Sequence, residues 1–276
     1  HPLPFTPFKD FTGRSINEIN LYSSEMASAL CSIDRVSASA NMTNRLSEAI
    51  VEAYKETNGA PITFTKMLEE YQSKMADPSK DDTISSVLKQ LVRANIFEEE
   101  DKADLIGDCY IIKMDGYPKD GPIAKAIVYF LISKLNNIYE QLEKQATNDE
   151  VVQIRHFSII DEAHYMLDFD NRPLRNLIAV GRNKGLSIIL ATQNMSSFKS
   201  KGFDFYANAQ YPLIMKQQTI DDKVIKDLFG VSGNELQEIR TAIAGLQKGE
   251  LIIKDQMAFA LGMGKKYKKI NVTHLI

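Results

Sequence analysis

Apolar residues recur at helical spacing through the first third of the chain. Between residue 15 and about residue 100, apolar positions three and four apart alternate with polar ones, as in amphipathic helices that share a core. Gly59-Ala60-Pro61 and Asp77-Pro78 are typical helix breaks. The pattern predicts an all-helical subdomain over residues 15–104, with helices at Ser15–Ile33, Met42–Tyr54, from Thr63 and, capped by Asp82, from Thr83.

Two polar or proline-rich segments flank these helices. Prolines 2, 4 and 7 fix the backbone of the opening, so residues 1–14 are predicted to be an extended linker or surface segment. The acidic run Glu98–Asp101 is predicted to be a solvated loop rather than a metal site, because its side chains need not converge.

From Cys109 the pattern changes to short apolar runs that alternate with helices. A strand over Tyr110–Met114 is followed by a long helix from Gly121-Pro122, and the polar tract Gln145–Glu150 is expected to be a loop. This alternation predicts an α/β fold with a mostly parallel sheet over residues 105–276. The next elements are a buried strand through Phe157 and Ile160, a helix Asn171–Lys184 and a strand Leu186–Leu190.

The last quarter of the chain predicts further strands around two short helices. Pro212 places the strand Tyr211–Met215 at a sheet edge or at its own start. The helices are Asp221–Phe229 and Glu235–Ala244, and the closing strands are Gly249–Ile253, Met257–Leu261 and Lys268–Val272.

Candidate chemistry lies at the ends of the two central strands. Asp161 and Glu162 follow an apolar strand directly, the form of a Walker B element, and the carboxyl ends of parallel strands face the ligand site. Asp161 would hold Mg²⁺ through a water, and Glu162 would activate the water that attacks the γ-phosphate of ATP. Gln193 ends the second strand and would sense that phosphate. The alternative is that both acids only suit the dipole of a following helix.

Composition limits the class of protein without naming a partner. The 276 residues are 44% hydrophobic and 25% charged, with a net charge of −3, which argues against a uniformly basic nucleic-acid-binding protein. Two distant cysteines suggest neither disulfides nor zinc, and no apolar run reaches the roughly 18 to 20 residues that cross a membrane. A cytoplasmic location is expected, and the abrupt start at His1 suggests a piece of a longer protein.

One basic cluster stands out near the end of the chain. The residues Lys265, Lys266, Tyr267, Lys268 and Lys269 are predicted to form a turn between the last two strands. They could contact a nucleic-acid backbone, although a solvated hairpin turn is the simpler interpretation.

The segments Ser158–His164 and Val180–Gln193 together resemble the HerA/FtsK group of P-loop ATPases, which are ring-forming DNA translocases. In that group a Walker B strand ending in Asp-Glu is followed by a helix, a Gly-Arg-x-x-Gly turn and a strand ending in a glutamine. The resemblance covers about residues 109–255 and implies an incomplete RecA-like core with the helical region as an insertion. More narrowly, the Pro-rich opening and the carboxyl half together resemble the carboxyl-terminal ATPase portion of the HerA-type subunit of phosphorothioation-dependent DNA restriction systems.

The resemblance implies partners and one further site residue. It implies DNA, a homo-oligomeric ring such as a hexamer and other subunits of a restriction complex, while the lack of a long apolar run predicts no membrane partner. Arg182 is the implied arginine finger, reaching the ATP of a neighbouring subunit. The alternative is that Arg182 and Lys184 cap the helix that precedes Gly185. Asp-Glu-Ala-His also spells a signature of another helicase family, whose Ser-Ala-Thr element is absent.

One part of the expected site is missing from the sequence. No Gly-x-x-x-x-Gly-Lys-Ser/Thr loop occurs, so the Walker A phosphate cradle is absent. It would precede His1 in a longer parent, or the chain is an inactive homologue, and this chain alone is expected to bind ATP poorly. The leading hypothesis is the carboxyl-terminal part of a DNA-translocating ATPase in restriction or defence; the alternative is a non-catalytic assembly module that recruits partners.

Overall fold

The computed structural model describes residues 2–33, 38–118, 121–148, 151–167, 169, 171–193, 195–200, 203–209, 211–262 and 264–272. The chain forms two compact units: residues 1–158 with 169–189, and residues 159–168 with 190–276. The division passes through two central strands, whose last residues belong to the second unit. These two units differ in kind from the predicted linker, helical insertion and ATPase core, so that predicted division stays a prediction.

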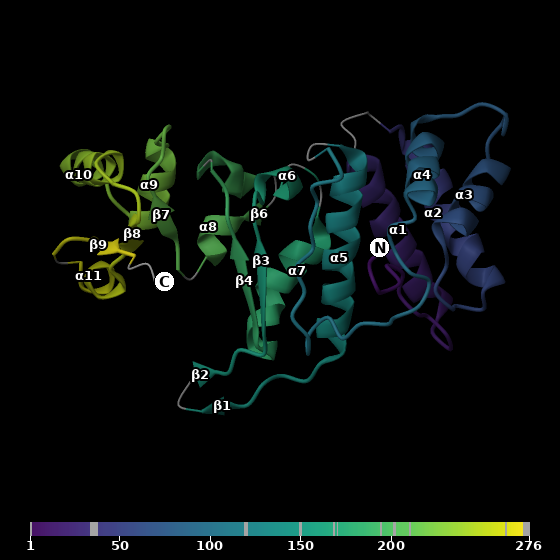
Figure 1. The fold of residues 1–276 in the computed structure, drawn as a ribbon, viewed down its shortest axis with the longest axis horizontal. Helices are drawn as coiled ribbons and strands as arrows, with labels where there is room; N and C mark the ends of the chain where they lie inside the picture. Colours follow the sequence, from purple (N-terminus) through teal and green to yellow (C-terminus); the bar gives the residue numbers. More distant parts are fainter. Residues whose placement is uncertain are drawn as a thin grey trace. The chain divides into compact units, whose positions relative to one another are not determined.

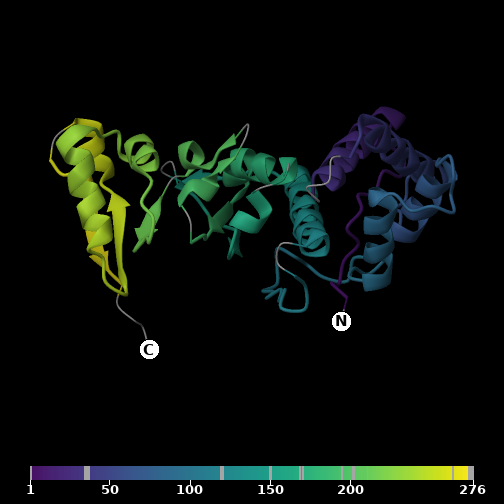
Figure 2. The ribbon, with the colours of Figure 1, turned by 90° about the horizontal axis from the view of Figure 1, so that it is seen from above.

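Helices dominate the first unit (Figure 1). Successive helices pack together from α1 to α4, and α5 packs with α1, α4 and α7 (Figure 2). Asp82 and Ser85 form a capping box that starts α4, and Thr63 caps α3, so the predicted helix starts are confirmed. The helices are α1 (Ile16–Ile33), α2 (Ala40–Glu56), α3 (Phe64–Ser73), α4 (Thr83–Ala94), α5 (Pro122–Gln141) and α7 (Arg172–Val180), followed by the 3-10 turn η1 (Gly181–Lys184).

The opening segment is part of the core of this unit. Phe5, Phe8 and Phe11 are buried, and Phe8 packs edge-on against the rings of Phe64 and Phe130. The prediction of a surface segment is therefore wrong for these residues. Aromatic rings bury more apolar area than any other side chains, and here they outweigh the extended backbone that the prolines impose.

The predicted strand Tyr110–Met114 does not form. The segment has no regular structure, and no strand in the described part of the chain pairs with it. The exposed fraction of Ile111 is 86%, whereas Ile112 and Met114 line a pocket beside Leu3 and Ile127 of α5. Apolar composition favoured a strand, but a strand needs a neighbour for its backbone hydrogen bonds.

The central strands β3 (His156–Ile160) and β4 (Leu186–Leu190) are hydrogen-bonded neighbours. Their bonds run from Arg155 N to Gly185 O at the start to Ala191 N to Ile160 O at the end, so the strands are parallel, as predicted. β3 is not buried, however: the exposed fractions are 56% for Phe157 and 70% for Ile159. These two residues share one face of the strand, and no described element covers that face.

A second core lies in the second unit, between a sheet and two helices. The antiparallel sheet has the order β7-β8-β9, and helices α9 and α10 pack on the face that carries Ile214 and Ile252. Pro212 precedes the edge strand β7, as predicted. The bounds are β7 (Leu213–Met215), α9 (Asp222–Phe229), α10 (Gly233–Ala244), β8 (Glu250–Lys254) and β9 (Tyr267–Asn271), with the shorter α6 (His164–Leu167), η2 (Met195–Phe198), β5 (Lys199–Ser200), β6 (Phe203–Asp204) and α8 (Phe205–Asn208).

Two predictions near the end of the chain are wrong. The residues predicted as a strand at Met257–Leu261 form the helix α11 (Gln256–Leu261). Asp255 Oδ1 accepts hydrogen bonds from Met257 N at 3.1 Å and Ala258 N at 3.2 Å, which is the chemistry of a helix start. Tyr267–Lys269 belong to β9 rather than to a turn, and Met263 of that predicted turn lies outside the described residues.

The remaining loop predictions are partly right. Glu98–Asp101 is a loop, and Asp101 forms an ion pair with Lys134 at 2.6 Å. The tract predicted as a loop at 145–150 contains β1 (Thr147–Asn148), which pairs with β2 (Val151–Val152); residues 149 and 150 lie outside the described part. Among the described residues, no helix has the length and apolar character needed to span a membrane.

Candidate active site

Two backbone bonds align the ends of β3 and β4. Ala191 N donates to Ile160 O at 2.9 Å, and Ala163 N donates to Ala191 O at 2.8 Å. The side chain of Ala163 is fully buried. The residues that follow each strand are therefore held side by side within the second unit.

Glu162 occupies a strained backbone position. Its φ is +51°, in the left-handed region that residues other than glycine, asparagine and aspartate seldom adopt. Asp161 Oδ1 accepts a hydrogen bond from Glu162 N at 2.9 Å and so supports this turn. Such strain costs about 1 to 3 kcal/mol and is common at functional sites. It directs Glu162 toward the end of β4 while Asp161 stays exposed.

The predicted acid and amide are in contact. Gln193 Nε2 donates to Glu162 Oε1 at 2.6 Å. The other carboxylate oxygen, Oε2, is buried and has no hydrogen-bond partner among the described residues. A buried carboxylate oxygen without a donor is costly, so this oxygen has the capacity to accept a further hydrogen bond.

His164 and Thr192 also belong to this site, although the sequence did not identify them as site residues. His164 Nδ1 lies 3.3 Å from Glu162 Oε2 and 3.3 Å from Thr192 Oγ1. The distance from Nδ1 to Oε2 suits an ion pair, but the orientation of the two groups does not suit a hydrogen bond. Oε2 therefore has no hydrogen-bond partner among the described residues. Their positions in the sequence could have identified them: His164 follows Glu162 by two residues, and Thr192 directly precedes Gln193.

Arg182 lies in the turn that precedes β4, within the first unit. Its side chain is exposed and makes no hydrogen bond or ion pair with the described residues. Gly185 has φ +82°, and a Cβ there would come within 2.7 Å of Gln153 O; a Cβ on Gly181 would come within 2.9 Å of Leu186. Gly185 is therefore needed for the turn that presents Arg182, whereas a larger residue at Gly181 would require only a shift of the Leu186 side chain.

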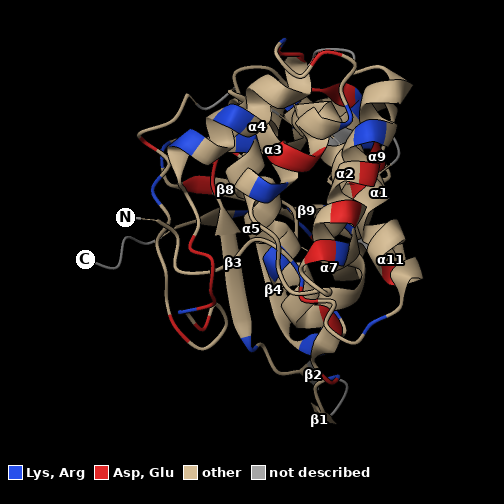
Figure 3. Ribbon diagram, turned by 90° about the vertical axis from the view of Figure 1, so that its right-hand side faces the viewer, with Lys and Arg blue, Asp and Glu red and all other residues tan. Residues whose placement is uncertain are grey.

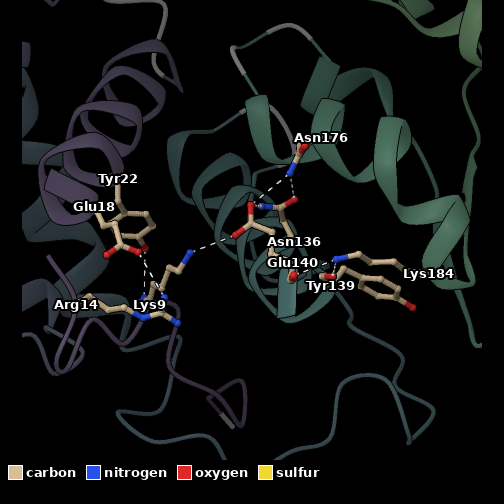
Figure 4. Close-up of polar contacts among 9 residues, drawn as sticks. All are labelled: Lys9, Arg14, Glu18, Tyr22, Asn136, Tyr139, Glu140, Asn176 and Lys184. Carbon is tan, nitrogen blue, oxygen red and sulfur yellow. Dashed lines mark hydrogen bonds and ion pairs between the residues drawn. The ribbon is translucent and has the colours of Figure 1, made fainter. Parts of the chain in front are cut away.

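Lys184 does cap a helix, but not the one expected. Its Nζ donates to the carbonyl oxygens of Tyr139 at 2.5 Å and Glu140 at 3.0 Å, at the end of α5 (Figure 4). The prediction that Lys184 caps the helix 171–184 is wrong, since the last carbonyls of α5 bind it instead. Asn176 of α7 also bonds to Asn136 of α5 at 2.7 Å, so polar contacts join these two helices.

Each lysine of the basic cluster has an acidic partner. Lys265 pairs with Glu238 at 2.8 Å, and Lys268 pairs with Asp255 at 2.9 Å. The other pairs are Lys266 with Glu235 and Lys269 with Glu250. Charges of both signs are likewise interspersed on the ribbon in Figure 3. Hydrogen bonds from the lysines lower the pKa values of the Glu238, Glu250 and Asp255 carboxyls.

The chemistry of the strand ends fits a nucleotide with its metal. No cluster of three or more His, Cys, Asp or Glu side chains that could hold a metal ion occurs among the described residues. Mg²⁺ does not require one, since it commonly binds one or two protein carboxylates, water and substrate phosphates. Exposed Asp161 and the unpaired Glu162 Oε2 are the groups that fit a hydrated cation and an attacking water.

Comparison with solved structures identifies the fold. VirB4 of Thermoanaerobacter pseudethanolicus matches with a TM-score of 0.67 and 18% identity, over 98% of this chain and 73% of that one. The bacterial conjugative coupling protein TrwB matches in an unbound form (TM-score 0.51, 12% identity, 99% and 73% coverage). Plasmid coupling protein TrwB in complex with the ATP analogue ADPNP also matches (TM-score 0.50, 12% identity, 98% and 72% coverage).

These matches show an α/β fold of the RecA-like P-loop ATPase kind, with only part of its core present. The predicted fold class is therefore confirmed. None of the three neighbours supports the narrower resemblance to DptH, the phosphorothioation-dependent restriction subunit. No protein-family model and no curated protein matches the sequence.

Proposed function

We propose that this chain carries the hydrolytic half of the nucleotide site in a FtsK/HerA-type ATPase that moves DNA. The contact between Glu162 and Gln193, at the ends of two adjacent parallel strands, is the observation that carries this proposal. A general base and a phosphate sensor must both reach the same γ-phosphate, so they must lie together. The fold likeness to VirB4 and TrwB adds support, since one of the TrwB structures holds an ATP analogue.

The residues of the site have distinct roles in this proposal. Mg²⁺, when bound, neutralises charge on the ATP phosphates. Asp161 holds the metal through a water, Glu162 orients and deprotonates the attacking water, and Gln193 detects the γ-phosphate. The strained backbone of Glu162 keeps its carboxylate at the strand end rather than in solvent.

Arg182 supplies charge stabilisation to a neighbouring subunit in a ring. Its guanidinium is exposed and has no partner among the described residues, and this suits a residue that acts on another copy. We expect Arg182→Ala to lower ATP turnover by about 10³-fold. Mixed with Glu162→Gln protein, it should recover partial turnover, because some interfaces then pair an intact finger with an intact base. If mixing recovers nothing, Arg182 does not act in trans.

In this proposal the phosphate-binding loop comes from residues other than these 276. Phe157 and Ile159 expose an apolar face on β3, and both faces of a parallel strand are normally covered. This exposure favours a further segment of the natural protein that covers β3. The alternative, a non-catalytic assembly module, is favoured by the absence of a Walker A loop from the 276 residues. A Walker A loop encoded in frame upstream of His1 supports the enzyme; a natural start near His1 supports the module.

The proposal further includes action on DNA, assembly into a ring, and a biological setting for the motor. The coupling-protein neighbours act in conjugation by name, so a conjugation-type motor has more support than a restriction role. The proposed DNA contact consists of Lys265, Lys266, Tyr267, Lys268 and Lys269. The four lysines must first exchange their carboxylate partners for DNA phosphates.

The test is a DNA-stimulated ATPase assay on the natural protein that contains this chain. We expect turnover with Mg²⁺ and ATP that DNA stimulates. Asp161→Asn should abolish most of it, whereas Asp222→Asn, which removes an exposed acid paired with Arg240, should not. Absence of turnover in the natural protein, under conditions where it binds DNA, would favour the assembly module.

A further inference from the structure

A histidine and a threonine contact each other beside the carboxylate of Glu162. His164 follows Glu162 by two residues, and Thr192 precedes Gln193, so the pair joins the ends of β3 and β4 a second time. The side chains of Glu162 and His164 are only 25% and 29% exposed. This is a second polar link across the strand ends, in addition to the bond between Glu162 and Gln193.

The two oxygens of Glu162 have different partners. Oε1 accepts from Gln193 at 2.6 Å, whereas Oε2 is buried and has His164 Nδ1 as a potential donor at 3.3 Å. With its proton on Nδ1, His164 has one hydrogen for two acceptors, Thr192 Oγ1 and Glu162 Oε2, each 3.3 Å away, and a small rotation of the ring shifts it toward the carboxylate, which is the stronger acceptor. Glu162 is therefore held on one side by a strong bond and on the other by a donor that is nearly in place.

The imidazole ring is itself held in position. It lies against the ring of Tyr165, with 4.1 Å between the ring centroids, and Thr192 Oγ1 contacts the same Nδ1 from β4. Met166 and Leu167 of α6 are buried and anchor the short helix that carries His164. A ring fixed by packing and by a neighbouring strand can orient another side chain, because it loses little freedom when the bond forms.

We propose that His164, held by Thr192, is a positioning residue that aims the Glu162 carboxylate. This inference rests on the proposed ATPase function. Gln193 Nε2 carries two hydrogens, so it can keep one on Oε1 of Glu162 and offer the other to a γ-phosphate; in either case it fixes only Oε1, and Oε2 needs a second donor. His164 is that second donor, and it keeps Glu162 directed at the attacking water. Its effect is on the rate of the chemical step and not on the affinity for ATP.

The kinetic test compares three variants of the natural protein that contains this chain. We expect His164→Ala to lower kcat for ATP by about 10- to 100-fold with little change in KM. His164→Asn places an amide donor near the position of Nδ1 and should recover most of the loss. His156→Ala is the matched control, since the His156 ring contacts Ser158 Oγ at 3.1 Å near the start of β3, and this variant should leave kcat unchanged. Equal losses for the Ala and Asn variants, or a rise in KM alone, would overturn the positioning role.

Thr192 provides an independent arm. Thr192→Ser keeps the hydroxyl and should retain most of kcat, whereas Thr192→Val keeps the shape and should lower kcat in the same direction as His164→Ala. The double variant His164→Ala, Thr192→Val should be no slower than His164→Ala alone, because Thr192 acts through the ring. Losses that multiply would show that Thr192 acts separately.

A measurement without ATP separates this inference from the proposed function. Thermal unfolding of His164→Ala, Glu162→Ala and the double variant forms a double-mutant cycle. If His164 and Glu162 interact, the shifts in Tm do not add; additive shifts contradict the inference. If the natural protein hydrolyses no ATP, the proposed function fails and this cycle still decides whether His164 holds Glu162.

Discussion

Two charged clusters of the second unit differ in what surrounds them. At the strand ends, Glu162 contacts Gln193 and leaves one buried oxygen unpaired on a strained backbone. In the basic cluster around β9, four lysines face four carboxylates, and these pairs lie at the surface. A buried polar atom without a hydrogen-bond partner is costly, whereas paired surface charges contribute little to stability.

The difference also separates two ways of interpreting a sequence. Both clusters are conspicuous as runs of charged residues, and the basic run is the longer. Its acidic partners come from α10, the start of β8 and Asp255, which are adjacent in space only after folding. A local run of charge therefore overstates the field that a DNA phosphate would meet.

The largest expected effect is on the base. Glu162→Gln should lower kcat for ATP by about 10³-fold, because the amide cannot accept the proton of the attacking water. Steady-state ATPase rates of the natural protein measure this loss. Glu238→Gln, which removes the partner of Lys265, is the matched control and should change kcat by less than about twofold. A similar loss of kcat in both variants would show that the strand ends and the basic cluster do not differ in their importance for ATP hydrolysis.

A smaller effect is expected at the sensor. Gln193→Ala removes the donor to Glu162 and should lower kcat by about 10- to 100-fold. Gln217→Ala, on a half-buried side chain that bonds to Met215 O at 3.4 Å, controls for loss of a glutamine. Stopped-flow or quench measurements of a single turnover would locate the loss in the chemical step. Unchanged single-turnover rates would remove Gln193 from the site.

A still smaller effect is expected for DNA binding by the basic cluster. Replacing Lys265 and Lys266 by alanine should weaken DNA binding by less than about tenfold and reduce the salt dependence by at most about two phosphate contacts. Fluorescence anisotropy with a DNA duplex at several salt concentrations measures both. A larger loss would mean that the ion pairs to Glu238 and Glu235 are given up readily for phosphate. No change would remove these lysines from the DNA-contacting surface.

The smallest effect concerns acid stability. The pKa values of Glu238, Glu250 and Asp255 are lowered by hydrogen bonds from their lysines, so the folded state binds fewer protons than the unfolded state. The stabilisation is present above the ordinary carboxyl pKa values and is lost as pH falls through the lowered ones. Thermal scans from about pH 6 to about pH 3 should show a smaller drop in Tm for Lys269→Gln, which has already lost one pair. An identical drop in both proteins would show that the pair contributes nothing.

The sequence predicted most of the helices and the contact at the strand ends. N-cap residues such as Thr63 and Asp82 act locally, so their effect is visible in the sequence. Parallel strands bring their carboxyl ends together, so the proximity of Glu162 and Gln193 followed from the order of elements. His164 was missed as a site residue because its partners lie across two strands.

The errors come from interactions that the sequence does not contain locally. Residues 110–114 have strand composition but no strand beside them, and the opening segment has prolines but three buried rings. Residues 257–261 were predicted to form a strand, and one side chain, Asp255, instead starts a helix. In each case a partner or a cap decided between structures of similar local propensity.

The most direct test is the nucleotide retained by the Glu162→Gln protein. The natural protein and this variant are incubated with Mg²⁺ and labelled ATP, separated from free nucleotide, and the bound species is identified by chromatography. The account predicts that the variant retains unhydrolysed ATP while the natural protein retains ADP. ADP formed by the variant at the rate of the natural protein would contradict the assignment of β3 and β4 as the hydrolytic half of the site.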